Sequence, residues 1–285
     1  PEAETQVNAA LSLAAAMAAG VRSGRDKLTI ELHPELATLG LWLEQLIAES
    51  LGKDGTGVVP VVGEPLADPA VYGDDRLFVV NDPTTPAAAA LRAAGHPVVH
   101  MPSAPDLLTL GQIVVTAELA TALAGAAIGV QPFDQPDVAA AKAATNEVLE
   151  EGGAEVATTP LAELLAHVRP GDHLAIQVFG DPDGPEVGRL EAARLALRDE
   201  LRVAVTLGFG PRFLHSTGQL HKGGPDAIVC VQAVGPDHEE IAIPGRDIGF
   251  GQLKAAQAAG DLRALQARGI RAGRVDLAEL LAAAS

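Results

Sequence analysis

The chain has 285 residues, enough for one large or two ordinary domains, and its 48% hydrophobic content excludes a disordered chain. Its formal net charge of −17, from 37 acidic and 20 basic residues, argues against nonspecific nucleic-acid binding, which needs basic surfaces. Aromatic residues make up only 3%, so we expect a core of small aliphatic side chains on helices and parallel strands.

The cysteine content and the N-terminal segment favour a cytoplasmic protein. The single cysteine, Cys230, excludes an intrachain disulfide, and its apolar neighbours predict a buried, inert thiol. The alanine-rich N-terminus shows no positively charged leader and no apolar stretch of spanning length, so we expect no membrane partner.

Apolar runs alternate with amphipathic stretches through the first half, which is typical of a parallel sheet wrapped by helices. We expect strands at residues 27–32, 58–62, 76–80 and 97–101. We expect helices at residues 34–50, in the alanine-rich stretch ending at Gly95, at 107–129 and at 138–150. The strongly apolar helix at 107–129 is expected to be buried on most sides.

The alternation of apolar runs and amphipathic stretches changes near Gly152 and Gly153, and we expect a domain boundary there. The fold class predicted is α/β, with a helix-flanked parallel sheet in residues 1–152 and a smaller α/β domain in residues 153–285. In this second half, strands are expected at 173–179, 203–207, 227–234, 239–243 and 274–277. Helices are expected at 161–167, 186–201, 251–259, 262–267 and at the C-terminus.

The most informative segment is residues 215–224, HSTGQLHKGG, which follows an apolar run expected to be a strand. It combines two imidazoles, two hydroxyls, an ammonium group and three glycines. Histidine is suited to proton transfer near neutral pH, and the lysine ammonium group can bind a phosphate. Glycine lets backbone N–H groups approach an anion closely. We interpret the segment as a ligand-binding loop; the alternative is a solvated loop whose histidines cap neighbouring elements.

A second candidate is Glu49, at the end of an apolar helix and just before a glycine turn. Partial burial there would raise the pKa of a carboxyl group, as suits a general base. From spacing alone, an ordinary charged helix terminus is the stronger interpretation.

Two segments of the first half resemble those of glucose-6-phosphate isomerases. Residues 47–55, IAESLGKDG, resemble the E-S-x-G-K segment, in which the glutamate is the catalytic base. Residues 131–142, QPFDQPDVAAAK, resemble the F-D-Q-x-x-V-x-x-x-K segment, in which the lysine reaches the active site. The resemblance implies that residues 1–152 form the second sugar-isomerase (SIS-type) subdomain.

The second half resembles the C-terminal portion of bifunctional transaldolase/glucose-6-phosphate isomerase fusion proteins, at residues 210–225 and again from 243 to 261. Neither the family's first subdomain, with its phosphate loop, nor a transaldolase barrel is found in these residues. The resemblance therefore implies a longer polypeptide whose upstream isomerase subdomain is a partner of this part. Ordinary isomerases also carry a T-N-G-Q-H segment soon after the base, but residues 63–68 contain no histidine.

The resemblance implies interconversion of glucose 6-phosphate and fructose 6-phosphate through an enediolate, without metal or cofactor. Glu49 would be the base, and Lys142 with His215 or His221 would serve ring opening and charge stabilisation. The residues that would bind the sugar phosphate are Ser216, Thr217, Gln219 and Lys222. Two alternatives stay open: a noncatalytic sugar-phosphate-binding or assembly module, and activity only in the full fusion protein. The oligomeric state is open too, a homo-oligomer included.

Overall fold

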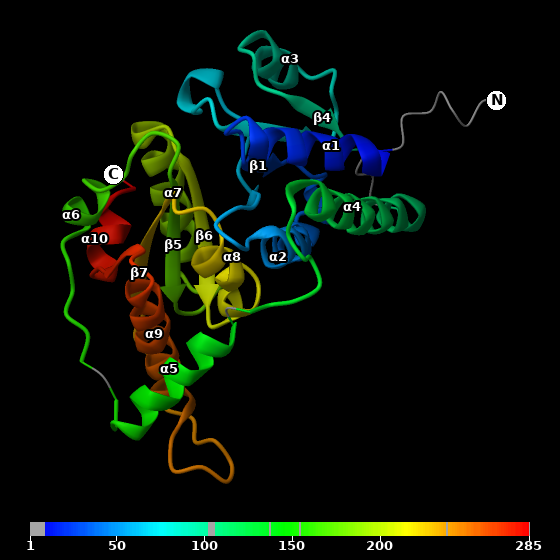
Figure 1. Cartoon of the computed structure of the whole chain (residues 1–285). Coiled ribbons are helices and arrows are strands. Elements are labelled where there is room, and N and C mark those ends of the chain that lie inside the picture. Colours follow the sequence, from blue (N-terminus) through cyan, green and yellow to red (C-terminus); the bar gives the residue numbers. More distant parts are fainter. Residues whose placement is uncertain (1–8, 102–105, 137, 154, 238, 285) are drawn as a thin grey trace. The chain divides into compact units, whose positions relative to one another are not determined.

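The computed structural model describes residues 9–101, 106–136, 138–153, 155–237 and 239–284, without the side chains of residues 138–142. The chain is an α/β protein with two parallel four-stranded sheets, each flanked by helices, so the expected fold class is confirmed (Figure 1). It divides into two compact units, Pro1–Gln135 with Gly223–Pro225, and Pro136–Lys222 with Asp226–Ser285.

The first unit contains a sheet with the strand order β2-β1-β3-β4. Its strands are β1 (Lys27–Ile30), β2 (Val59–Val62), β3 (Arg76–Val80) and β4 (Val98–His100). Its helices are α1 (Ala9–Arg22), η2 (Pro34–Leu36), α2 (Leu39–Leu51), η3 (Pro69–Val71), α3 (Pro86–Ala93) and α4 (Leu107–Ile128). Two of these helices have N-cap residues: the side chains of Thr85 and Asp106 accept hydrogen bonds from backbone N–H groups in the first turns of α3 and α4.

Helices cover both faces of the first sheet. Alternate strand residues such as Leu28 and Leu77 pack in one apolar cluster with α1, α2 and α4. The residues of β3 that point the other way, Phe78 and Val80, pack with Tyr72 and α3. A strand buried on both faces is mostly apolar, which explains why the expected strand positions in this half agree with the structure.

The second unit contains a sheet with the strand order β6-β5-β7-β8. Its strands are β5 (His173–Phe179), β6 (Ala204–Gly210), β7 (Ile228–Val234) and β8 (Arg271–Arg274). Its helices are α5 (Val138–Glu150), α6 (Leu161–Leu165), α7 (Val187–Leu201), η4 (Arg212–His215), α8 (Gly218–Gly223), α9 (Phe250–Ala267) and α10 (Leu277–Ala282). Cys230 is fully buried on β7, and burial raises the pKa of its thiol, as expected for an inert cysteine.

Three expectations for the second half are wrong. The strand expected at 274–277 lies earlier, as β8 (Arg271–Arg274), and Leu277 begins α10. Residues 239–243 form no strand: Ala242 makes only an isolated bridge with Gly249, while the carboxylate of Glu240 accepts a hydrogen bond from the backbone of Gly251. The two helices expected at 251–259 and 262–267 are one helix, α9. Its central Gly260 lets α5 approach closely, since a Cβ there would lie 2.7 Å from the backbone nitrogen of Thr145.

Helix α5 packs on α9 and belongs to the second unit, whereas the sequence predicts it in the first domain. Val148 of α5 is buried against Ala256 and Ala259 of α9. The first compact unit thus ends at Gln135 and the second begins at Pro136. A domain boundary between residues 152 and 153 stays a prediction.

Helix α4 is not buried on most sides, contrary to expectation. One face packs on α1 and α2, whereas Leu108, Val115 and Leu119 on the other are 73%, 55% and 50% exposed. Within the described residues, α4 is the one helix whose length and hydropathy would suffice to cross a membrane.

Candidate functional site

Glu49 lies in the last turn of α2, and a tight turn follows it. Glu49 is half-buried, and its Oε2 accepts a hydrogen bond of 3.1 Å from the Gln45 side chain. Lys53 and Thr56 form a bridge across the turn, and Gly55 between them has a φ of 76°. Gly57 has a φ of 149°, and a Cβ there would come within 2.7 Å of the Leu51 carbonyl oxygen, so glycine is required.

Lys53 joins the two segments that carry the isomerase resemblance. Its side chain is 2% exposed, and its Nζ donates to the carbonyl oxygen of Gln131 at 2.5 Å. The same Nζ lies 3.1 Å from Oδ1 of Asp134, which is 59% exposed. The E-S-x-G-K and F-D-Q segments are therefore in direct contact within the first unit, and Lys53 acts as the cross-link between them.

The lysine of the F-D-Q segment, Lys142, is a residue of α5, and the structure describes its backbone but not its side chain. Its reach toward a substrate stays a prediction. Glu49 and Lys142 belong to different units.

A backbone hydrogen bond connects the turn after Glu49 with the end of the segment at 215–224. The N–H of Gly55 donates to the carbonyl oxygen of Gly223 at 2.9 Å, and both glycines belong to the first unit. The final residue of α8 therefore contacts the glycine turn that continues from the candidate base.

The segment at 215–224 is mostly helical and buried, which corrects the expectation of a loop. His215 ends η4 and is exposed, whereas Thr217 and Gln219 are 6% and 1% exposed. Ser216, also buried, lies between η4 and α8. The candidate substrate-binding hydroxyls thus stand at the start of α8, and their contact with a phosphate stays a prediction.

Lys222 forms a buried ion pair. Its Nζ lies 2.5 Å from Oδ1 of Asp261 on α9, and the two side chains are 2% and 1% exposed. The ammonium group also donates to the Gly218 carbonyl oxygen at 3.4 Å. Because a carboxylate already matches this charge, a phosphate could use Lys222 only by competing with Asp261.

His221 is fully buried, and burial lowers its pKa to about 3, with the nearby Lys222 charge adding to the effect. The imidazole is therefore neutral at physiological pH. Its Nδ1 shares a hydrogen bond of 3.0 Å with the Gln177 amide. Its Nε2 and the Gln177 Oε1 are buried and meet no hydrogen-bond partner among the described residues.

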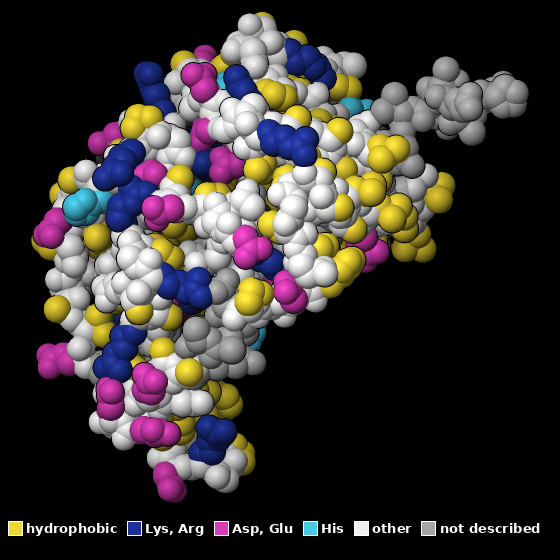
Figure 2. All heavy atoms as spheres, viewed as in Figure 1, with side chains coloured by type: hydrophobic (Ala, Val, Ile, Leu, Met, Phe, Trp, Pro, Cys, Tyr) yellow, Lys and Arg dark blue, Asp and Glu magenta, His cyan; other side chains and the backbone are white. Residues whose placement is uncertain are grey.

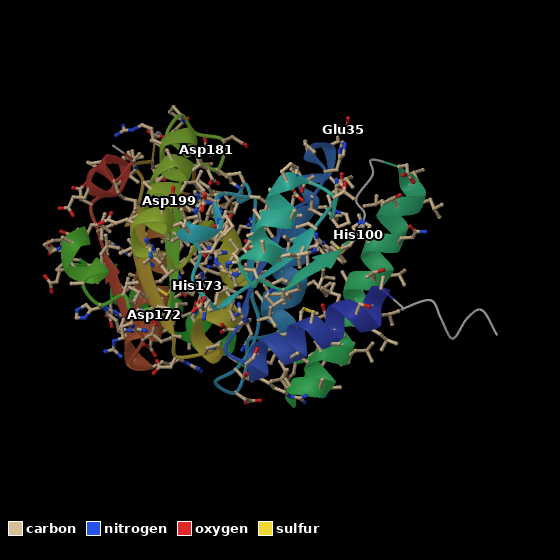
Figure 3. All side chains as sticks on the ribbon, turned by 90° about the horizontal axis from the view of Figure 1, so that it is seen from above. Glu35, His100, Asp172, His173, Asp181 and Asp199 are labelled. Atoms are coloured by element: carbon tan, nitrogen blue, oxygen red, sulfur yellow. The ribbon has the colours of Figure 1, made fainter. Side chains whose placement is uncertain are left out.

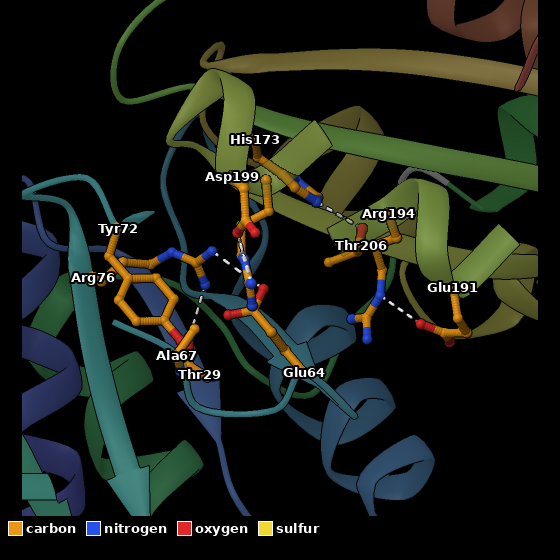
Figure 4. A network of polar contacts seen from close by, with 11 residues as sticks. Thr29, Glu64, Ala67, Tyr72, Arg76, His173, Glu191, Arg194, Asp199 and Thr206 are labelled. Carbon is orange, nitrogen blue, oxygen red and sulfur yellow. Dashed lines mark hydrogen bonds and ion pairs between the residues drawn. The ribbon is translucent and has the colours of Figure 1, made fainter. Parts of the chain in front are cut away.

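The surroundings of α8 are polar because one face of the second sheet carries polar side chains. On this face lies His173, labelled in Figure 3. It shares a hydrogen bond of 2.7 Å with Thr206 of the neighbouring strand (Figure 4). Gln232 of β7 donates to the Ala258 carbonyl oxygen of α9 at 3.0 Å. Buried polar groups fixed this way hold α8 and α9 in one arrangement on the sheet.

In the first unit, the stretch expected to hold the family's histidine contains a buried carboxylate instead. The Arg76 guanidinium donates to the Glu64 carboxylate at 3.3 Å and to the Thr29 hydroxyl at 2.7 Å (Figure 4). The guanidinium carbon lies 5.2 Å from the centre of the Tyr72 ring, within cation–π range. A guanidinium held by these groups stabilises the fold locally and does not replace an acid–base imidazole.

A cavity of about 290 Å³ opens at the carboxyl ends of β5, β6 and β7, where α/β sheets commonly bind ligands. Its charged lining is acidic, from Asp181, Glu186 and Asp237, and its one lysine, Lys254, is 2.6 Å from Asp237. Such a lining repels a sugar phosphate, so this cavity is a poor candidate for the substrate site.

Sequence reasoning missed Lys53, Asp134, Gln177 and Asp261. All four lie in or beside segments already recognised, but their partners are distant in the sequence, so spacing gives no signal for the pairs. Among the described residues, no group of three His, Cys, Asp or Glu side chains could hold a metal ion.

Comparisons with known proteins do not assign a family. No family model and no curated protein matches the chain. Among solved structures, a hypothetical protein of Thermus thermophilus matches with 15% identity and a TM-score of 0.34, over 98% of this chain and 81% of that one. A Salmonella typhimurium protein, provisionally described as sugar-binding, matches with 15% identity and a TM-score of 0.31, over 95% of each chain.

A third solved structure, from Clostridium difficile and provisionally described as a phosphosugar isomerase, has 14% identity and a TM-score of 0.27. The match covers 94% of this chain and 92% of that one. At these TM-scores the likenesses carry no argument about function.

Proposed function

We propose that the chain is part of an aldose–ketose isomerase that interconverts glucose 6-phosphate and fructose 6-phosphate. The observation that carries the proposal is the contact of Lys53 with Gln131 and Asp134, because it joins the two isomerase-like segments within the first unit. Within the same unit, the Gly55 N–H donates to the carbonyl oxygen of Gly223, the last residue of α8.

Each residue has a distinct task in this proposal. Glu49 removes a proton from C2 of the open-chain aldose and returns it to C1, and the reverse path runs in the other direction. Lys142 stabilises the negative charge of the enediolate. His215 donates and accepts the proton of ring opening, because it is exposed whereas His221 is buried and neutral. Substrate contacts come from Ser216, Thr217, Gln219 and Lys222.

The test is isomerase turnover measured beside equilibrium binding of fructose 6-phosphate. We expect turnover, with a dissociation constant for fructose 6-phosphate close to its KM. Binding without turnover, both in this chain and in the longer polypeptide, would contradict it.

A noncatalytic sugar-phosphate-binding module is the second candidate. The buried pair of Lys222 and Asp261, with the neutral His221 beside it, favours this candidate, because neither Lys222 nor His221 is ready to assist chemistry. A third proposal is that the upstream isomerase subdomain completes the site. Turnover that rises sharply when that segment is added would support it, since positioning of bound substrate contributes about 7–11 kcal/mol.

A further inference from the structure

We propose that the cavity at the carboxyl ends of β5, β6 and β7 binds a small organic ammonium compound with an apolar body. The cavity lies wholly within the second unit and has a volume of about 290 Å³, enough for a small ligand. Its ligand differs in charge from the sugar phosphate of the proposed isomerase, so this is a second binding site with a function of its own.

The backbone of the sheet forms the floor of the cavity. Gly180 follows β5, Gly210 ends β6 and Gly235 follows β7, so three neighbouring strands end at the cavity without a side chain. The Gly235 N–H donates to the Phe179 carbonyl oxygen at 2.9 Å, which fixes the ends of β5 and β7 relative to each other. The space is therefore formed by fixed backbone before a ligand binds, which lowers the cost of binding.

An apolar wall continues the core of the second unit into the cavity. Val178 and Leu190 are buried in the main apolar cluster of this unit, and Phe209 and Leu277 pack against that cluster. A ligand that covers this wall removes apolar surface from water. The wall therefore favours a ligand with a hydrocarbon body over a bare ion.

Two carboxylates without a cationic partner stand side by side at the cavity. Asp181 follows β5 and is labelled in Figure 3, and Glu186 precedes α7. A Cβ at Gly184 would lie 3.2 Å from Oε2 of Glu186 and 3.3 Å from Cβ of Asp181, so both side chains approach the same glycine. Within the part of the chain that the structure describes, neither carboxylate forms an ion pair. Two neighbouring carboxylates favour a charged hydrogen-bond donor between them.

The lining already holds one ammonium group. Nζ of Lys254 lies 2.6 Å from Oδ1 of Asp237 and donates to the Gly235 carbonyl oxygen at 3.2 Å. The Lys254 side chain is 15% exposed, so the cavity accommodates an ammonium group that is largely withdrawn from water. Three carboxylates and this one lysine leave the charged lining net negative, and a second ammonium group matches it.

The charge of the cavity differs from that of the surface drawn in Figure 2, where Lys and Arg side chains are interspersed with Asp and Glu over α9 and α5. Among the described residues, no group of three His, Cys, Asp or Glu side chains could hold a metal ion. The acidic lining therefore selects an organic cation, and the apolar wall binds its body.

The first test is a ¹H–¹⁵N NMR titration with three compounds of equal chain length: pentylamine, 1-pentanol and pentanoate. Pentylamine should shift the amide signals of Gly184 and Gly235 and bind with a dissociation constant of about 1 mM. Pentanol should bind at least ~10-fold more weakly, and pentanoate should not bind, because the lining repels its charge. Pentylamine without shifts at these amides, or pentanoate binding as tightly as pentylamine, overturns the proposal. Displacement of pentylamine by an equal concentration of Mg²⁺ would assign the site to a metal ion and overturn it too.

The second test uses charge variants, with far-UV circular dichroism to verify each fold. Asp181→Asn with Glu186→Gln keeps the side-chain sizes and the oxygen that accepts the Asp183 N–H, and should weaken pentylamine binding at least ~10-fold. Lys254→Met removes the resident cation and should tighten binding ~3–10-fold.

The matched control is Arg263→Met, which also removes a cation from an ion pair on α9 but lies outside the cavity. Arg263 is about 13 Å along the helix from Lys254, beyond the screening length of about 8 Å at physiological salt, so its variant should change the dissociation constant less than about twofold. Equal tightening by Lys254→Met and Arg263→Met, or unchanged binding by the double variant, would assign binding to the net charge of the protein and overturn the proposal.

Discussion

The backbone N–H of Gly55 donates a hydrogen bond of 2.9 Å to the carbonyl oxygen of Gly223. Gly55 belongs to the turn that follows Glu49, and Gly223 ends the short helix that carries His221 and Lys222. The turn that follows Glu49 therefore contacts Gly223 within the first unit.

The turn after Glu49 requires glycine at position 57 more strictly than at position 55. At Gly57 an added Cβ would overlap the Leu51 carbonyl oxygen, whereas at Gly55 nothing lies within 4 Å. We expect Gly55→Ala to lower the free energy of unfolding by about 1 kcal/mol, from positive φ alone. Gly57→Ala should lower it by about 3 kcal/mol or more, because steric overlap adds to the strain. Urea denaturation compares the two; equal losses would show that the overlap is relieved.

The pair of Lys222 and Asp261 should behave as a buried ion pair. Lys222→Met leaves the Asp261 carboxylate buried without its counter-charge and should lower the free energy of unfolding by about 3–5 kcal/mol. The double variant Lys222→Met with Asp261→Leu should recover most of this loss. Chemical denaturation of the two single variants, the double variant and the wild type gives the coupling energy. A double variant as unstable as the sum of the singles would contradict a direct pairing.

His221 should make the protein sensitive to acid. An unfolded histidine binds a proton below about pH 6.5, whereas folded His221 has its pKa lowered to about 3, so unfolding takes up a proton between these values. The stability supplied by the neutral imidazole is present above about pH 6.5 and is lost as the pH falls. We expect His221→Asn to reduce the pH slope of the free energy of unfolding by about 1.4 kcal/mol per pH unit between about pH 6 and 4.

The matched control for this slope is His215→Asn, which changes an exposed histidine in the same segment. Denaturant unfolding at closely spaced pH values measures all three proteins. A slope that follows His215 and not His221 would contradict the assignment of the buried imidazole.

His215 should act in ring opening rather than in proton transfer between carbons. His215→Gln should slow turnover of fructose 6-phosphate by ~10²-fold, as for the loss of one acid–base group. Turnover of a four-carbon aldose phosphate should change little, because its terminal phosphate blocks ring closure. Steady-state kinetics on both substrates decides between the roles; equal losses on both would remove His215 from ring opening.

The fold was largely predictable because both sheets are parallel and buried. Strands such as β2 are uninterrupted apolar runs, and such runs are visible in the sequence. The errors come from tertiary contacts. Gly260 and Asp261 suggested a helix break, but Gly260 admits α5 and Asp261 binds Lys222, so α9 continues through both.

The candidate site was predictable as segments but not as geometry. The glycines after Glu49 and the residues at 215–224 were visible as patterns. Their contact through Gly55 and Gly223 joins residues far apart in the sequence, and so does the link from Lys53 to Asp134. The ion pair between Lys222 and Asp261 was not predictable either, because nothing in the sequence around Asp261 indicates its distant partner.

The most direct test of the proposed function is solvent deuterium exchange at the reacting carbons of fructose 6-phosphate, followed by proton NMR in D₂O. The wild type, in the longer polypeptide if the chain alone is slow, should exchange a C1 hydrogen while forming glucose 6-phosphate. Glu49→Gln should bind substrate equally well and lose at least ~10²-fold in exchange, whereas Glu35→Gln, an exposed glutamate of the same unit, should keep it. Exchange by Glu49→Gln at the wild-type rate, or binding by the wild type without exchange, would contradict an isomerase with Glu49 as its base.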